Sequence, residues 1–132
     1  MAYGTVLTDT VQSSTASTPP TFKDGNGTQV GTLCRAWVNF DGTTSPGTIR
    51  ASFNVTSVTK NGTGDYTINF TNAMPDANYA AGSLCSYDNA NNPYRYATAY
   101  SWSASALRIN TFYNDTGSTK YDAGYVTVSV FR

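Results

Sequence analysis

From Val30 onward, apolar and polar side chains alternate along the chain with a period of two. This alternation is typical of β-strands that bury one face. The first clear run ends at the turn dipeptide Asp41-Gly42. Its expected inward residues are Cys34, Ala36, Val38 and Phe40, and its expected outward residues are Leu33, Arg35, Trp37 and Asn39.

A β-hairpin is predicted between the next two alternating runs. The dipeptide Asn61-Gly62 separates them, and Asn-Gly between alternating runs is the strongest short-range signal for a hairpin turn. Asp65, which begins the second run, is interpreted as a turn residue. The side chains expected to point inward are Ile49, Ala51, Phe53 and Val55 from the first run, and Tyr66, Ile68 and Phe70 from the second.

The second half of the chain continues in the same style. Segments rich in Asn, Asp, Gly and Pro separate further expected strands, and no segment follows the helical period. These strands are Tyr79–Ser86, Tyr94–Trp102, Leu107–Tyr113 and Tyr125–Phe131. Many short strands separated by turns predict an all-β protein, with an antiparallel β-sandwich or jelly-roll-like domain over residues 30–132.

Residues 1–29 differ from the rest and predict an extended N-terminal arm for docking or assembly. A Ser/Thr stretch at 13–18 leads into Pro19-Pro20, a composition that favours an extended chain. The apolar residues of the arm have no local strand to pair with, so we expect them to anchor it to another chain; the alternative is a first strand paired within its own sheet. The predicted assembly residues are Val6, Leu7, Val11, Pro19 and Pro20.

Composition narrows the function classes. The 132 residues include 21 Thr, 13 Ser, 12 Asn and 11 Gly, whereas Glu and His are absent and all 8 acidic residues are Asp. Without His, a Ser-His-Asp or Cys-His catalytic site and a zinc-protease motif are excluded. The 8 Lys and Arg balance the 8 Asp, so the chain has no electrostatic bias toward nucleic acid or an anionic membrane. Because of this charge balance, we expect no nucleic-acid partner. No apolar run approaches the ~18 residues of a membrane-spanning helix, so we also expect no membrane insertion.

The two cysteines, Cys34 and Cys85, are too few for a disulfide framework or a structural zinc site. The sequence leaves open whether they pair. The chain begins Met1-Ala2-Tyr3, with neither a basic region nor an apolar stretch, so we expect no secretory signal. Synthesis in a reducing cytosol, with both cysteines as buried free thiols, fits this cysteine usage.

The acidic residues offer few candidates for chemistry. Glycoside hydrolysis needs two carboxyl groups about 5–10 Å apart, but most of the Asp residues stand at expected turns, where Asp bonds to the local backbone. The segment from Asp24 resembles the start of a calcium loop, yet its twelfth position is Arg35, a cation. The loop at 88–92 is rich in oxygens but carries no further metal signal. We therefore predict no catalytic residues, no metal site and no cofactor.

An aromatic run within the expected strand Tyr94–Trp102 is the main candidate for an interaction site. If the alternation is unbroken, its large aromatic side chains share one face of the strand. Because Tyr and Trp combine an apolar ring with a polar edge, such a face suits a subunit interface or a platform for sugar rings, and it equally suits the core of the domain. The four residues are Tyr94, Tyr96, Tyr100 and Trp102.

Four segments between residues 34 and 79 resemble a known module. They read AWVNF-DG from Ala36, IRASFNV from Ile49, NGTGDYT-NF from Asn61 and AMPDANY from Ala73. This block is similar to a module of virion structural proteins in tailed bacteriophages, found near the C-terminal end of tail fibres and in short free-standing virion proteins. The match covers residues 30–79. Residues 80–132 are similar only in style, which suits a variable recognition or surface region.

The resemblance implies a non-enzymatic structural protein of the virion surface. The expected place is a tail fibre or spike, or its receptor-binding tip, displayed as a homo-oligomer. The family implies a trimer, contacts with other virion proteins, and a host surface glycan as a further partner. The alternative is a capsid decoration (cement) protein, anchored to capsid subunits by the N-terminal arm. A minor alternative is a depolymerase of host polysaccharide, although the family contributes no catalytic residues.

Overall fold

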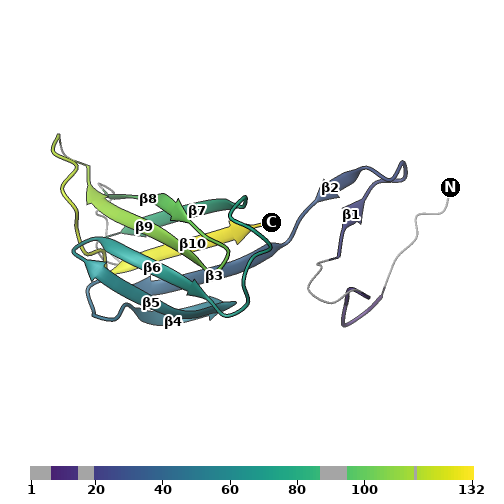
Figure 1. Ribbon diagram of the computed structural model, residues 1–132, viewed down its shortest axis with the longest axis horizontal. Helices are drawn as coiled ribbons and strands as arrows, with labels where there is room; N and C mark the ends of the chain where they lie inside the picture. Colours follow the sequence, from purple (N-terminus) through teal and green to yellow (C-terminus); the bar gives the residue numbers. More distant parts are fainter. Residues whose placement is uncertain (1–6, 15–19, 87–94, 115) are drawn as a thin grey trace. The chain divides into compact units, whose positions relative to one another are not determined.

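The computed structural model describes residues 7–14, 20–86, 95–114 and 116–132 (Figure 1). Within these residues the regular structure consists of β-strands without a helix, and every pairing between strands is antiparallel. The predicted all-β class with antiparallel pairing is confirmed. The chain forms two compact units, Met1–Leu33 and Cys34–Arg132.

The described part of the first unit contains a two-stranded antiparallel pair, β1 (Phe22–Lys23) and β2 (Gln29–Gly31). The turn between them is organised by Asp24, whose Oδ1 accepts hydrogen bonds from the backbone N–H groups of Asn26 and Thr28, each at 2.9 Å. Gly27 has φ +82°, a conformation that glycine adopts without strain. The segment from Asp24 is thus a tight turn between β1 and β2.

The described residues of the second unit form two four-stranded sheets, which Figure 1 shows as two layers. Sheet I has the strand order β4-β3-β10-β7 and sheet II the order β5-β6-β9-β8. The strands are β3 (Cys34–Asp41), β4 (Thr48–Phe53), β5 (Val55–Gly62), β6 (Asp65–Phe70), β7 (Ala80–Ser86), β8 (Arg95–Trp102), β9 (Ala106–Tyr113) and β10 (Tyr125–Phe131). The late strands β9 and β10 occupy central positions, so the C-terminal part of the chain is needed to complete both sheets.

Both sheets contribute to one hydrophobic core. The inward residues predicted for β6 are buried, as are those predicted for β3 except the half-buried Cys34. Phe40 of sheet I meets Tyr66 of sheet II edge to face, with ring centroids 5.2 Å apart. Full burial of each large apolar side chain contributes about 1.5–3 kcal/mol. Core residues of sheet I include Ala36, Val38, Phe40, Val126, Val128 and Val130, and those of sheet II include Val58, Tyr66, Ile68, Leu107 and Ile109.

The run at 49–56 is not one strand with one buried face, and that prediction is wrong. The register between β3 and β4 shifts at Arg50, so Ile49 pairs with Phe40 whereas Phe53 pairs with the outward Trp37. This bulge reverses the alternation, because an extra residue changes which face the following side chains occupy. Phe53 is 54% exposed as a result.

At Asn54 the chain leaves sheet I and enters sheet II. Asn54 has φ +56°, which turns the backbone sharply between β4 and β5. Its amide fixes the corner: Nδ2 donates to the carbonyl oxygens of Arg35 and Asn72, both at 3.0 Å, and Oδ1 accepts from the Asn72 N–H at 2.7 Å. Asn is among the few residues other than Gly that tolerate this conformation.

The predicted hairpin between β5 and β6 is confirmed, but its turn lies two residues beyond the Asn-Gly dipeptide. Gly62 pairs with Asp65, which leaves Thr63 and Gly64 as the turn residues. Gly64 has φ +58°, and a Cβ at this position would lie 2.5 Å from the carbonyl oxygen of Thr111. Glycine is therefore required here both by its backbone conformation and by the close approach of a neighbouring segment.

Candidate functional site

The predicted aromatic ladder is divided by a β-bulge in β8. Tyr96 pairs with the half-buried Phe112, whereas Trp102 pairs with the fully buried Leu107, because the register shifts between Ala99 and Ser101. Tyr100 is the extra residue of this bulge. The expectation that one face carries all the aromatics is therefore wrong for Trp102. Tyr94 lies outside the described residues.

Tyr100 belongs to a charged cluster centred on Asp65. Its hydroxyl donates to Asp65 Oδ1 at 2.9 Å. Arg108 binds both carboxylate oxygens, through Nε at 2.9 Å and Nη2 at 3.2 Å, and Lys120 Nζ lies 3.2 Å from Oδ2. Asp65 directly follows the turn at Thr63-Gly64, as expected of a turn residue, but it is only 9% exposed and also binds two cations. No sequence pattern indicates this cluster, because its cations come from β9 and from the segment before β10.

The Asp65 carboxylate is held in its charged form by the groups around it. Burial, the largest single effect, raises the pKa of Asp65, but hydrogen bonds from Arg108, Tyr100 and Lys120 together lower the pKa to about 2. The carboxylate therefore stays charged over the physiological range. Its two cations leave the cluster with one net positive charge, and both side chains remain 42% exposed.

Other polar residues on the outer face of sheet II are also paired with one another. Asn69 Nδ2 donates to the hydroxyls of Ser57 and Thr59, both at 3.0 Å. Asn61 Nδ2 donates to the Thr67 hydroxyl at 2.9 Å. These contacts cross between neighbouring strands, so they support the sheet. On the same face, the buried Oδ1 of Asn110 has no hydrogen-bond partner among the described residues.

The outer face of sheet I is different, because large apolar side chains are exposed on it. Leu84 of β7 is 75% exposed and Trp37 of β3 is 41% exposed. The register places both on the side opposite the core, since Leu84 pairs with Thr127 and Trp37 pairs with Ser129. Phe53 and Phe131 are exposed on the same face. We call this surface the apolar face.

A groove of about 610 Å³ runs across the apolar face between Trp37 and Leu84. Its floor is formed by β10 and β7, where the small residue Gly82 leaves room above the sheet. Thr127 and Ser129 of β10 present hydroxyl groups to the groove, and neither hydroxyl is bonded to another described side chain. None of the described residues that line the groove is charged. The sequence placed Trp37 outward correctly but could not show which residues of β7 and β10 lie beside it.

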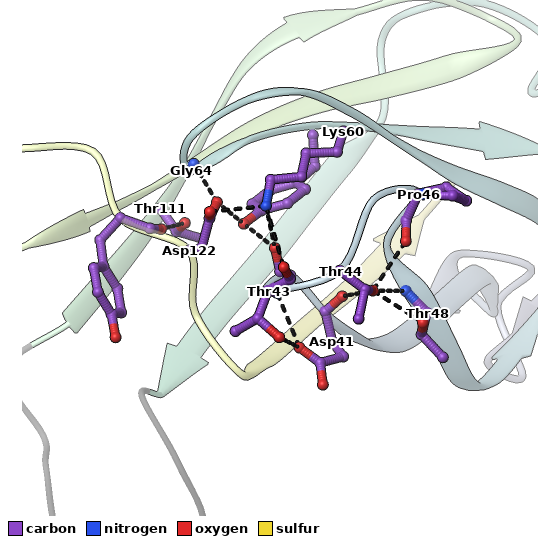
Figure 2. A network of polar contacts seen from close by, with 12 residues as sticks. Asp41, Thr43, Thr44, Pro46, Thr48, Lys60, Gly64, Thr111 and Asp122 are labelled. Atoms are coloured by element: carbon purple, nitrogen blue, oxygen red, sulfur yellow. Dashed lines mark hydrogen bonds and ion pairs between the residues drawn. The ribbon is translucent and has the colours of Figure 1, made fainter.

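A second polar network, around Asp122, joins loops (Figure 2). Asp122 Oδ2 accepts from Lys60 Nζ at 2.8 Å, and Oδ1 accepts from the Gly64 N–H at 2.8 Å and lies 2.9 Å from the Tyr66 hydroxyl. Lys60 also donates to the carbonyl oxygen of Gly42 at 3.1 Å. The network ties the β3–β4 loop, the β5–β6 turn and the segment before β10 together. Its acceptors and donors are all occupied, so it is structural.

The pKa values of the Asp122 network follow from this geometry. Burial, the largest effect, raises the pKa of Asp122, but hydrogen bonds from Gly64, Lys60 and Tyr66 together hold it below its ordinary value. Burial also raises the pKa of Tyr66, and the neighbouring Asp122 carboxylate raises it further. At neutral pH the Asp122 side chain is therefore a carboxylate and the Tyr66 side chain a neutral phenol.

The remaining carboxylates of the second unit are likewise held by structural contacts. Asp41 accepts from the backbone N–H and the hydroxyl of Thr43 and lies 3.1 Å from Arg50 Nη2. Asp76 caps the turn at Asn78 and lies 2.6 Å from Arg132 Nη2. In the part of the chain that the structure describes, no three His, Cys, Asp or Glu side chains come together as metal ligands. Asp88 and Asp115 lie outside the described residues.

The two cysteines are free thiols in the structure. Cys34 donates through Sγ to the carbonyl oxygen of Ala36 at 3.3 Å. Cys85 is half-buried against the core, and this burial raises the pKa of its thiol to about 11. A thiol with so high a pKa is a poor nucleophile near neutral pH.

Two of the predicted assembly residues of the N-terminal arm are exposed. Leu7 is 93% exposed and Val11 is 67% exposed. Pro20 is half-buried. Val6 and Pro19 lie outside the described residues.

Comparisons with protein-family models, with curated proteins and with solved structures find no match to this chain. A search of the described residues for a helix long and apolar enough to cross a membrane also finds none.

Proposed function

We propose that this chain is a non-enzymatic virion structural protein of a tailed phage, part of a tail fibre or spike or its receptor-binding tip. In this proposal a β-sandwich, built from sheets I and II, is displayed at the virion surface as a homo-oligomer, and the N-terminal arm docks it to other virion proteins. The observation that carries the proposal is the apolar face with its groove. An exposed indole, an exposed leucine and unbonded hydroxyls on one sheet face are typical of a recognition surface.

The segments that resemble the phage module have structural tasks in this fold. Ala36, Met74 and Tyr79 are buried, and Gly64 is required by its positive φ. Trp37 and Phe53 are exceptions, because the module includes both although the core does not use their side chains. The groove thus combines three residues of the module, Trp37, Val38 and Asn39, with residues from β7 and β10, which belong to the part that resembles the family only in style.

The state of the carboxylates supports a non-enzymatic role. Asp41, Asp65, Asp76 and Asp122 each contact a Lys or Arg. A general acid for glycoside hydrolysis needs a raised pKa, whereas each of these four residues has a lowered pKa. None of the four suits that role.

Labelling of intact virions tests the proposed location. An antibody against the second unit should decorate the tail under electron microscopy, and deletion of residues 1–20 should abolish incorporation into particles. Because this deletion leaves β3 to β10 intact, the truncated chain should still fold, which circular dichroism would verify. Full incorporation of the truncated chain would refute the role of the arm.

The capsid decoration alternative is supported by the same exposed arm residues, Leu7 and Val11, since an anchoring arm suits either location. Decoration of the capsid instead of the tail would select it. The depolymerase alternative makes a separate prediction: host polysaccharide would be cleaved, and an Asp→Asn substitution would abolish cleavage.

A further inference from the structure

The groove on the apolar face has two apolar walls of unlike shape. Trp37 supplies a flat indole, 41% exposed, and Leu84 supplies a branched side chain that projects from β7. An exposed indole beside polar groups is suited to ligands that have an apolar face and a polar rim. A volume of about 610 Å³ is within the usual range for small-ligand sites, about 300–1,000 Å³.

The floor of the groove offers hydrogen bonds that the protein does not use. The hydroxyls of Thr127 and Ser129 stand on the outward side of β10, between the two walls, and they bond to no other described side chain. The amide of Asn39 lies beside them, with only a long contact of 3.5 Å from Arg50 Nη1 to its Oδ1. These three groups can both donate and accept.

The described residues that line the groove carry no formal charge, and this favours uncharged ligands over charged ones. An acidic or phosphorylated ligand would have no cation in the groove to meet it, and a basic ligand would have no carboxylate. A dry apolar protein surface would cover the two hydroxyls without bonding them, at a cost of about 1–3 kcal/mol for each unsatisfied group. The matching chemistry is an uncharged molecule with an apolar face and several hydroxyl groups.

We propose that the groove binds a neutral saccharide, with the C–H face of one pyranose ring on Trp37 and its hydroxyls bonded to Thr127 and Ser129. This inference rests on the proposed recognition function and names its ligand class. For a single sugar ring, the usual gain per atom corresponds to a dissociation constant of roughly 1 mM. Several copies displayed on one fibre would raise the apparent affinity.

The test uses the full chain and a printed array of neutral and acidic oligosaccharides, followed by titration of the strongest neutral hit by NMR. We expect Trp37→Ala to weaken binding at least tenfold. The double substitution Thr127→Val with Ser129→Ala, which keeps the shape of the floor, should weaken it about tenfold by removing hydrogen bonds. Trp102→Ala is the matched control, because Trp102 is 42% exposed on sheet II, and it should leave binding unchanged.

Four results would overturn the proposal. The first is that no neutral oligosaccharide binds up to about 10 mM, and the second is that Trp37→Ala and Trp102→Ala weaken binding equally. The third is a preference for acidic oligosaccharides that survives Trp37→Ala. The fourth is sedimentation showing that Trp37→Ala dissociates an oligomer that binds no saccharide. Circular dichroism of each variant separates lost binding from lost folding. Virion labelling does not depend on saccharide binding. Failure of the proposed tail location and failure of the proposed saccharide site can therefore be distinguished.

Discussion

Both sheets have four antiparallel strands, but their outer faces differ in the hydrogen bonding and exposure of their side chains. On sheet II, Asp65 holds Arg108 and Lys120, and Asn69 bonds two hydroxyls across to β5. On sheet I, Trp37 and Leu84 are exposed above hydroxyls that bond to no described side chain. Polar groups that satisfy each other stabilise the fold, whereas groups left unsatisfied beside an exposed indole are available to a partner. This difference is the reason for proposing the outer face of sheet I, the less polar of the two, as the recognition surface.

Among the polar residues, Asp122 is expected to contribute most to the free energy of unfolding. Asp122→Ala would leave the ammonium group of Lys60, whose side chain is only 14% exposed, without its carboxylate, and the Gly64 N–H without an acceptor. Breaking such a partly buried pair should lower the free energy of unfolding by about 3 kcal/mol. Urea denaturation measures this. A loss under about 1 kcal/mol would show that the network in Figure 2 is not structural.

On the outer face of sheet II, Asp65→Asn should have the next largest effect. The substitution keeps the shape of the side chain but removes the charge that Arg108 and Lys120 share. Both cations are 42% exposed and remain partly solvated, so we expect a loss of about 1–2 kcal/mol. An unchanged urea midpoint would show that the Asp65 cluster does not stabilise the fold, and the outer face of sheet II would then not differ from that of sheet I in this respect.

The pH dependence of stability sharpens the same point. Because the pKa of Asp65 in the folded chain is about 2, below the ordinary 3.8, the carboxylate's contribution is complete above pH 4 and is lost as the pH falls toward 2. Urea titrations of the native chain and of Asp65→Asn should therefore converge in this window. Parallel curves down to pH 2 would contradict the assignment of the low pKa to Asp65.

The smallest effect on stability is expected on the apolar face. Leu84→Ala should change the free energy of unfolding by less than about 0.5 kcal/mol, since Leu84 is 75% exposed. The matched control is Leu107→Ala, at a fully buried leucine of β9, for which about 2–5 kcal/mol is expected. A comparable loss of unfolding free energy in both variants would mean that Leu84 stabilises the fold and is not an exposed contact residue.

The sequence predicted the strands well where alternation was unbroken. The buried side chains of β3 and β6 followed directly from period two, because each strand has one face toward the core. The prediction failed where a bulge added a residue. The shift at Arg50 turned Phe53 outward, and the shift near Tyr100 separated Trp102 from the other aromatics. Local sequence carries little information about such bulges, because they depend on how a neighbouring strand is paired.

The candidate site was less predictable than the fold. Trp37 was expected to point outward, but the groove also needs Leu84 and the hydroxyls of β10, which are brought together only by the insertion of β10 between β3 and β7. The Asp65 cluster depends in the same way on the neighbouring β9. Contacts between strands that are distant in sequence follow from topology, and the alternation within each strand does not specify topology.

The most direct test of the central claim, that the outer face of sheet I is the recognition surface, compares the two tryptophans. Trp37 and Trp102 are equally exposed, at 41% and 42%, so hydroxyl radicals should oxidise them at similar rates in the isolated chain. Footprinting with and without a bacterial cell-envelope preparation then shows whether the apolar face is covered, with Trp102, which lies at the end of β8 away from that face, as the internal control. We predict that oxidation of Trp37 falls severalfold while that of Trp102 is unchanged. Protection of Trp102 alone, or equal protection of both residues, would contradict the claim.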